Sequence, residues 1–263
     1  MRAEENQIKE VKNGENKPRR VAAFFDLDGT LIAGPSLERR FFQELRCRRV
    51  IGGKNYLWWM AQALRLVPHG IDKIIQANKM YLRGVAAAGR ARDLGEGMKP
   101  EFFAPAIERL AWHAQRGDAI VIVSGTLEPL ARRAARELGT ILMRRGIKAE
   151  VHICAIRLEE NHGRWTGQII GEAMFGGAKA RAARRLAAQM GFDLKQSYAY
   201  GDSAQDWWML DAVGNPWAVN PSPELSRVAR EKNWPILRWN KRKEFTKRAQ
   251  RRAEAVTGPG SLG

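Results

Sequence analysis

Three apolar segments of the chain each end abruptly in small polar or acidic residues. They read VAAFFDLDGT over residues 21–30, AIVIVSGT over 119–126 and SYAYGDS over 197–203. Such apolar runs, bounded by turn residues, predict strands buried inside a sheet. Helical patterns alternate with these strands, and this alternation predicts an α/β fold with a Rossmann-like, mainly parallel sheet.

The polar ends of these segments are expected to meet. In an open α/β sheet, ligands bind in the crevice outside the carboxyl ends of the strands. The residues DLDGT, SGT and GDSAQD follow three such ends, so one crevice should hold all three clusters. The sequence therefore predicts a single polar site at one edge of the sheet.

A long helical block separates the first two predicted strands. The segment SLERRFFQELRCRR begins with a plausible N-cap, Ser36, and further helical patterns surround YLWWMAQALRL, IDKIIQANKMYLRGV and PAIERLAWHAQRG. Because this block is too long for one crossover, we interpret it as a helical cap inserted over the sheet. The predicted parts are a flexible tail at 1–20, a core at 21–33 and 117–240, the cap at 34–116, and a basic tail at 241–263.

The net charge of the chain favours acidic partners but does not indicate which kind. The 263 residues carry a net charge of +17, which favours phosphorylated substrates, anionic lipid surfaces or nucleic acid. The predicted C-terminal helix, Lys241–Arg252, is either a solvated charged helix or a weak contact with anionic lipid.

Cellular location is inferred from what the sequence contains. Cys47 and Cys154 are the only cysteines, and two such distant residues form neither a disulfide framework nor a zinc signature. The polar N-terminal stretch lacks the apolar centre of a signal peptide, and no apolar run is long enough for a transmembrane helix. We therefore expect a cytoplasmic protein with reduced thiols.

Four aspartates occupy the predicted crevice: Asp26, Asp28, Asp202 and Asp206. Clustered carboxylates repel one another unless a cation lies between them. Oxygen ligands without histidine or cysteine favour Mg²⁺, whose coordination is commonly completed by a substrate phosphate. Taken singly, D-x-D is common by chance, and GDS could connect a strand to a helix as a capping group.

Two further side chains suit a phosphoryl group. The hydroxyl of Ser124 and the ammonium of Lys179 could bind its charged oxygens. An unhindered aspartate can act as a nucleophile that forms an aspartyl-phosphate, and a second one can transfer the proton. Alone, SGT is usually a turn and Lys179 a solvated helix residue, so the joint occurrence of these signals matters.

The four motifs together resemble the haloacid dehalogenase superfamily of phosphatases. The matching segments are DLDGT, the strand ending in SGT, GGAKARAARRL, and YGDSAQDWWML. The chain is most similar to subfamily IB, the branch with phosphoserine phosphatase and a helical C1-type cap, and the segment ENHGRWTGQIIG also resembles that branch. The resemblance covers about residues 21–222.

This resemblance implies roles for the two aspartates of the first motif. Asp26 would be the nucleophile and a Mg²⁺ ligand. Asp28 would be the general acid and base, and its backbone carbonyl would also bind the metal. An aspartate rather than a threonine at position 28 favours rapid hydrolysis over a long-lived phosphoaspartate.

The remaining roles implied by the resemblance fall on the other three motifs. Ser124, Gly125 and Lys179 would bind the phosphoryl oxygens. Asp202 would bind Mg²⁺, and Asp206 would support the metal and Lys179 from behind.

The substrate is less well indicated than the chemistry. Phosphoserine phosphatases carry a glutamate nine residues after the nucleophile, whereas this chain has Pro35 there, and Glu38 is out of register. The cap is rich in aromatic and basic residues, namely Trp58, Trp59, Arg65, Lys73, Lys79 and Arg83. These observations favour a small acidic or amphiphilic phosphomonoester as the substrate. Phosphoserine and histidinol phosphate are the alternatives. The two tryptophans could belong to the core of the cap or contact the substrate.

Two other classes of function stay open. The chain could be a membrane- or nucleic-acid-binding protein on a phosphatase-like scaffold, although an intact catalytic set argues against this and we do not expect nucleic acid as the partner. It could also transfer the phosphoryl group to an alcohol with the same residues.

Overall fold

A seven-stranded sheet forms the centre of the molecule. The computed structural model describes residues 20–70, 74, 78–87 and 99–239. Along the sheet the strand order is β4-β3-β2-β1-β5-β6-β7, and β3–β4 is its antiparallel pair. The strands are β1 Ala22–Phe25, β2 Ala119–Leu127, β3 Val151–Asn161, β4 Arg164–Ile170, β5 Tyr198–Gly201, β6 Asn215–Val219 and β7 Ile236–Leu237. The predicted Rossmann-like, mainly parallel α/β fold is confirmed.

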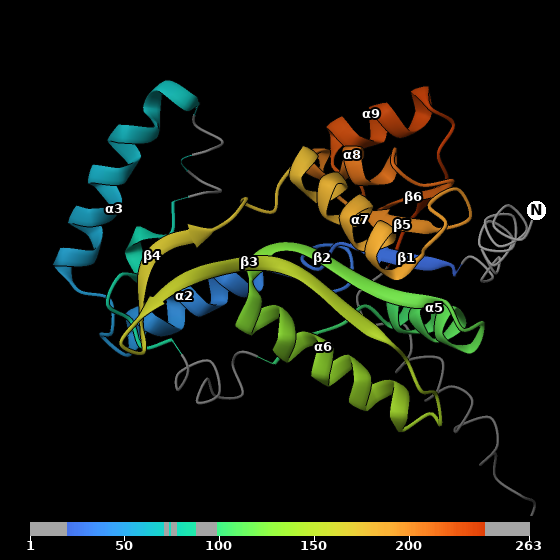
Figure 1. The fold of residues 1–263 in the computed structure, drawn as a ribbon, viewed down its shortest axis with the longest axis horizontal. Coiled ribbons are helices and arrows are strands. Elements are labelled where there is room, and N and C mark those ends of the chain that lie inside the picture. Colours follow the sequence, from blue (N-terminus) through green and yellow to red (C-terminus); the bar gives the residue numbers. More distant parts are fainter. Residues whose placement is uncertain (1–19, 71–73, 75–77, 88–98, 240–263) are drawn as a thin grey trace, which may run out of the picture.

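The three segments that end in polar residues become neighbouring central strands. β1 pairs in parallel with β2 on one side and with β5 on the other. All four residues of β1 are fully buried, as is most of β2, because helices cover both faces of the sheet. In Figure 1, α5 and α6 lie below the strands, whereas α7, α8 and α9 lie above them.

The core helices lie between successive strands of the sheet in the sequence. They are α5 Ala104–Gln115, α6 Glu128–Met143, α7 Gly177–Met190, α8 Trp207–Leu210 and α9 Pro223–Glu231, with a 3₁₀ turn at Ala204–Asp206. α7 ends where Gly191 adopts a left-handed conformation, with φ of 72°. This helix carries the third motif, and its first turn places Lys179 beside the strand ends.

In the part of the cap that the structure describes, there are two long helices and two 3₁₀ turns. These are α2 Leu37–Cys47, α3 Gly53–Leu66, η1 Val67–His69 and η2 Met80–Leu82. Ser36 caps α2, because its hydroxyl accepts a hydrogen bond from the backbone N–H of Arg39. The cap was predicted to reach residue 116 and therefore to include α5. In the structure, α5 contacts β2 and α6. The division between cap and core stays a prediction.

An arm connects the core to the cap. β3 begins parallel to β2 and then continues into an antiparallel hairpin with β4, through a turn at His162 and Gly163. The outer edge of β4 pairs with residues 84–87, since the backbone N–H of Gly84 donates to Trp165 and that of Trp165 donates to Val85. This hairpin therefore also supports the cap.

One predicted helix differs in the structure. The helical pattern over residues 71–85 gives way, in the described residues 78–87, to the short η2 turn and then to a segment paired with β4. Within residues 78–87, the side chain of Asn78 accepts from the backbone N–H of Met80, a local bond that competes with helix formation, and Gly84 has a φ of 79°.

The predictions on membrane spans, tails, location and thiols are met by the structure to different extents. No helix within the described ranges is long and apolar enough to cross a membrane. The predicted tails, residues 1–20 and 241–263, fall outside the described residues except for Arg20, which forms a bridge with Phe192. The cytoplasmic location stays a prediction. Both cysteines are free thiols.

A buried histidine joins α5 to the central strands. His113 lies 2.8 Å from the Oδ2 of Asp118 and 2.9 Å from the hydroxyl of Tyr200, and its ring packs edge-on against Phe25. Burial lowers the pKa of His113 to about 4, although hydrogen bonding to Asp118 opposes this effect. The histidine is therefore neutral in the folded protein at neutral pH.

We expect this histidine to make the folded state sensitive to acid. The unfolded chain binds a proton at this position near pH 6.5, whereas the folded chain does so only near pH 4. The free energy of unfolding should therefore fall as pH drops from about 6.5 to about 4, by about 3 kcal/mol from this group. Denaturant titrations at several pH values measure it.

His113→Gln is the matched control, since glutamine keeps hydrogen-bonding groups but does not titrate. Other titrating groups are common to both proteins and cancel in the difference between their unfolding free energies. Parallel loss of stability in the two proteins between pH 7 and pH 4.5 would contradict this role.

Candidate active site at the strand ends

A buried ammonium links two of the predicted carboxylates. The Nζ of Lys179 lies 2.6 Å from an oxygen of Asp26, after β1, and 2.6 Å from an oxygen of Asp206, after β5. All three side chains are almost completely buried. The structure thus brings together residues that are up to 180 positions apart in the chain, as the sequence predicted.

The other oxygen of Asp206 organises the loop after β5. Its Oδ2 accepts hydrogen bonds from the backbone N–H groups of Asp202 and Ser203, and from the Ser203 hydroxyl at 2.8 Å. Asp206 therefore has both oxygens engaged, one by Lys179 and one by this loop. Its role as a support for the metal and Lys179 stays a prediction.

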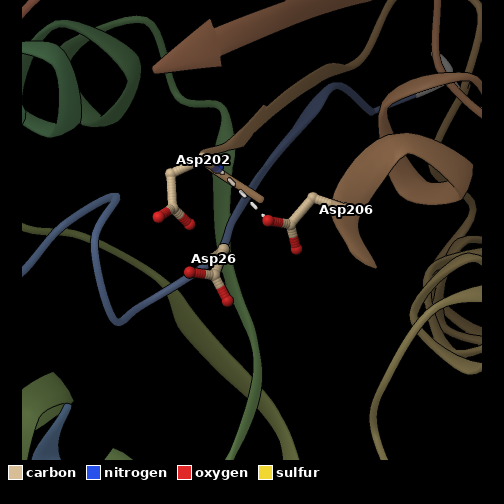
Figure 2. Close-up of side chains that lie close together, drawn as sticks. All are labelled: Asp26, Asp202 and Asp206. Atoms are coloured by element: carbon tan, nitrogen blue, oxygen red, sulfur yellow. Dashed lines mark hydrogen bonds between the residues drawn. The ribbon is translucent and has the colours of Figure 1, made fainter. Parts of the chain in front are cut away.

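Asp202 faces Asp26 across the crevice. Figure 2 shows the carboxylates of Asp26, Asp202 and Asp206 turned toward one another. Each offers an oxygen that lies within 4.8 Å of the others. The hydroxyl of Thr30 donates to Asp202 over 3.4 Å, and Gly29, with φ of 91°, passes directly beside the same carboxylate.

The three carboxylates of the site carry more negative charge than Lys179 can neutralise. Burial raises the pKa of Asp26 to about 7 against the opposing effect of Lys179, and burial and the charge of Asp26 raise the pKa of Asp202 to about 8. Burial alone would lower the pKa of Lys179, but the carboxylates of Asp206 and Asp26 outweigh it and raise that pKa. One ammonium therefore does not compensate three carboxylates.

A divalent cation fits this imbalance. The available donors are carboxylate oxygens, the ligands that Mg²⁺ prefers. Because the two oxygens of Asp206 are already hydrogen-bonded, Asp26 and Asp202 are the side chains best able to bind a metal. A cation between them would favour the charged form of both carboxylates.

Asp28 lies on the cap side of the site. Its Oδ1 accepts a hydrogen bond of 2.8 Å from the backbone N–H of Leu37, at the start of α2. Burial raises its pKa to about 6, the hydrogen bond from Leu37 opposes this, and the nearby charge of Glu38 adds to the rise. A carboxyl group with such a pKa can both donate and accept a proton near neutral pH.

The end of β2 contributes hydroxyl groups. Ser124 is buried, and its oxygen accepts from the backbone N–H of Thr126 at 3.1 Å. The hydroxyl of Thr126 is buried without a hydrogen-bond partner among the described residues. Gly125 lies against the ring of Phe175, and a Cβ at this position would overlap that ring.

A second polar cluster lies in the cap and was missed from the sequence. The carboxylate of Glu38 accepts from the buried ammonium of Lys79 at 2.5 Å and from the hydroxyl of Tyr81 at 2.6 Å. Glu38 and Lys79 are 41 positions apart, so no local pattern indicated their contact. Trp59 packs against the hydrophobic core, and the guanidinium of Arg83 covers the ring of Trp58 at 4.6 Å.

A pocket adjoins this cluster between the cap and the β4 arm. Lys79 and Met80 line one side of it, Gln62 of α3 another, and Gly167 and Gln168 of β4 a third. Gly167 is required at this position, because a Cβ would press on Met80.

Comparison with known proteins identifies relatives across most of the chain. The family model described as haloacid dehalogenase-like hydrolase matches residues 23–211. A probable phosphatase of Mycobacterium tuberculosis (strain H37Rv) is 33% identical over 241 residues, covering 87% of this chain and 79% of the relative. SerB1 of the same strain, named as a phosphoserine phosphatase, is 31% identical over 253 residues, covering 92% of this chain and 76% of the relative.

Solved structures share the fold. A protein of unknown function from Bordetella pertussis Tohama I is 25% identical with a TM-score of 0.62, over 83% of this chain and 98% of that one. A phosphoserine phosphatase solved as a phospho-aspartyl intermediate analogue is 17% identical with a TM-score of 0.56, over 89% of this chain and 99% of that one.

We expect Gly29→Ala to disrupt the site without unfolding the protein. A Cβ at position 29 would overlap the Oδ2 of Asp202, and the positive φ adds a backbone cost of about 1–2 kcal/mol. Displacing this carboxylate should weaken Mg²⁺ binding by about tenfold or more, as measured by isothermal titration calorimetry.

Gly34→Ala is the matched control. Gly34 has a similar φ of 87°, but a Cβ there would meet only the flexible end of Arg40 at 3.2 Å. It should cost comparable stability and leave Mg²⁺ affinity unchanged. Equal affinities in the two variants would show that Asp202 does not bind the metal.

Proposed function

The chain belongs to the haloacid dehalogenase-like hydrolase family and is a phosphatase, and we propose that it hydrolyses small phosphomonoesters through a phosphorylated Asp26. The observation that carries this mechanism is the ion pair between Lys179 and Asp26. The ammonium favours the charged, nucleophilic form of the carboxylate and leaves its other oxygen available for attack.

The first step transfers the phosphoryl group to the enzyme. A carboxylate oxygen of Asp26 attacks phosphorus, and the bond between phosphorus and the ester oxygen breaks. Asp28 gives its proton to the leaving alcohol, which suits a carboxyl group whose pKa burial raises to about 6. Lys179 and Ser124 bind the phosphoryl oxygens, where negative charge develops.

The second step returns the enzyme to its starting state. Asp28, now a carboxylate, accepts a proton from water, and the water oxygen attacks phosphorus. The bond to Asp26 breaks, inorganic phosphate leaves, and the Asp26 carboxylate again pairs with Lys179. The hydrogen bond from the backbone N–H of Leu37 keeps Asp28 oriented through both steps.

Mg²⁺ fits the site as the cofactor. Asp26, Asp202 and the backbone carbonyl of Asp28 would hold it, and Asp206 would keep Lys179 and the Asp202 loop in place. When bound, the ion would neutralise charge on the phosphoryl group.

The cap cluster supports an acidic substrate. Because Glu38 is already neutralised by Lys79 and hydrogen-bonded by Tyr81, it offers less to a substrate amine than an unpaired glutamate would. Lys79 lines the adjoining pocket, and because its ammonium has three N–H donors, it can bind an acidic group while it stays paired with Glu38. Phosphoserine, which carries both groups, is the alternative favoured by the name of the relative SerB1.

Asp26→Asn should lower hydrolysis of an aryl phosphate by about 10³-fold or more, because the amide cannot attack phosphorus. Burial already disfavours the charged form of this side chain, so the neutral amide should leave the fold intact. Acid quenching of the wild type with a ³²P-labelled substrate should trap a labelled protein, and the variant should remain unlabelled.

Asp118→Asn is the control, since Asp118 is equally buried but contacts His113 away from the site. It should keep its activity and its label. Labelling of the Asp26→Asn protein, or substantial turnover by it, would disprove the mechanism.

A substrate panel tests the assignment of Lys79. We expect kcat/KM for 3-phosphoglycerate to exceed that for histidinol phosphate by about tenfold, because only the former offers a carboxylate to the ammonium. Lys79→Met should remove this preference and leave aryl phosphate hydrolysis unchanged, whereas the surface variant Lys195→Met should change neither. A preference that survives in Lys79→Met would refute this assignment while leaving the phosphatase mechanism untouched.

A further inference from the structure

The outward side of α3 is apolar. The side chains of Leu57, Met60 and Leu64 are 64%, 54% and 72% exposed, and Val67, just past the helix end, is 59% exposed. Their spacing of three and four residues places them on one face of the helix. Isolated exposed apolar residues are ordinary, but a continuous apolar helix face usually marks an interaction site.

The inward side of the same helix is mixed, because Trp59 packs against the hydrophobic core beside the polar Asn55 and Gln62. Asn55 is buried, and its amide donates to the backbone carbonyls of Tyr81 and Arg83 at 3.0 and 2.8 Å. Gln62 lines the cap pocket. The helix therefore carries apolar residues on both sides, whereas a surface helix usually keeps them on the side that faces the protein.

The position of α3 leaves its outward face accessible. In Figure 1, α3 is the outermost element on the cap side, and β4 lies on the side of it that faces the rest of the molecule. The helix packs chiefly against η1 and η2. No other element in the described part of the chain covers the side that carries Leu57, Met60 and Leu64.

The charge around this face is positive. α3 contains no acidic residue, whereas Lys54 and Arg65 are exposed and lie on the same flank of the helix, three turns apart. The loop that enters the helix brings Arg49, which is also exposed. The whole chain carries +17.

We propose that α3 docks the cap on an anionic lipid bilayer, lying flat in the headgroup region. Leu57, Met60 and Leu64 enter the apolar boundary, while Lys54 and Arg65 contact lipid phosphates from the flank. Helices that combine an apolar face with flanking basic residues bind membrane interfaces in this way. Charge favours this occupant over a second copy of the chain, because two copies would bring like charges together.

Co-sedimentation of the full-length protein with vesicles tests the proposal. At physiological ionic strength, the protein should pellet with vesicles of phosphatidylcholine and phosphatidylglycerol, and much less with pure phosphatidylcholine. The triple variant Leu57→Gln, Met60→Gln, Leu64→Gln should bind anionic vesicles about tenfold more weakly or worse. Glutamine is a good helix former, and these side chains are exposed, so α3 should remain folded.

Met143→Gln is the matched control, because Met143 is 64% exposed at the end of α6, on the core. It should bind vesicles as the wild type does, and all three proteins should hydrolyse an aryl phosphate equally in solution. Equal vesicle binding by the triple variant and the wild type, or equal binding of the wild type to neutral vesicles, would overturn the proposal. Analytical ultracentrifugation offers a further test. The proposal would also be overturned if the wild type were a dimer and the triple variant were a monomer that still bound vesicles.

Discussion

The site depends on one buried ammonium shared by two carboxylates. Without Lys179, the charged forms of Asp26 and Asp206 would lie close together in a region from which water is largely excluded, at a high cost in free energy. The ion pairs join the ends of β1 and β5 to the first turn of α7. The same contacts that lower the cost of burial therefore also align Asp26, the proposed nucleophile, with the ammonium that we propose to bind phosphate. In this proposal, stability and chemistry share one interaction.

The fold supplies the rigid frame that this pairing needs. β1 is fully buried between β2 and β5, and its end can shift little because the backbone N–H of Asp26 donates to the carbonyl of Tyr200. The hydroxyl of Tyr200 in turn forms a hydrogen bond with His113 of α5. Positioning a reacting carboxylate on such a strand is more exact than positioning it on a loop. The cap reaches the site through the contact between Asp28 and the start of α2.

The core and its crevice were predictable from the sequence, and the cap was only partly so. Strands buried on both faces leave a continuous apolar signal, and the parallel arrangement brings their ends together whatever the loops do. The contact of Glu38 with Lys79 and Tyr81 has no such signal, because it depends on how η2 returns along β4. The pattern over residues 71–85 has helical periodicity, but in residues 78–87 pairing with a strand edge overrides it. Glu38 occupies the cap side of the site although the sequence places it out of register with the phosphoserine phosphatase glutamate.

The orientation of α3 could not be predicted from the periodicity of its sequence. Its pattern identifies two faces of a helix but not which face is turned inward, and the usual assumption assigns the apolar face to the core. In this helix both sides carry apolar residues, since Trp59 packs against the hydrophobic core. The hydrogen bonds of the buried Asn55 fix which side is turned inward, because an amide that satisfies two backbone carbonyls is costly to expose and replace. The orientation of the polar side chain thus determines the exposure of Leu57, Met60 and Leu64. A buried asparagine in an otherwise apolar helix is therefore informative about the surface as well as about the interior.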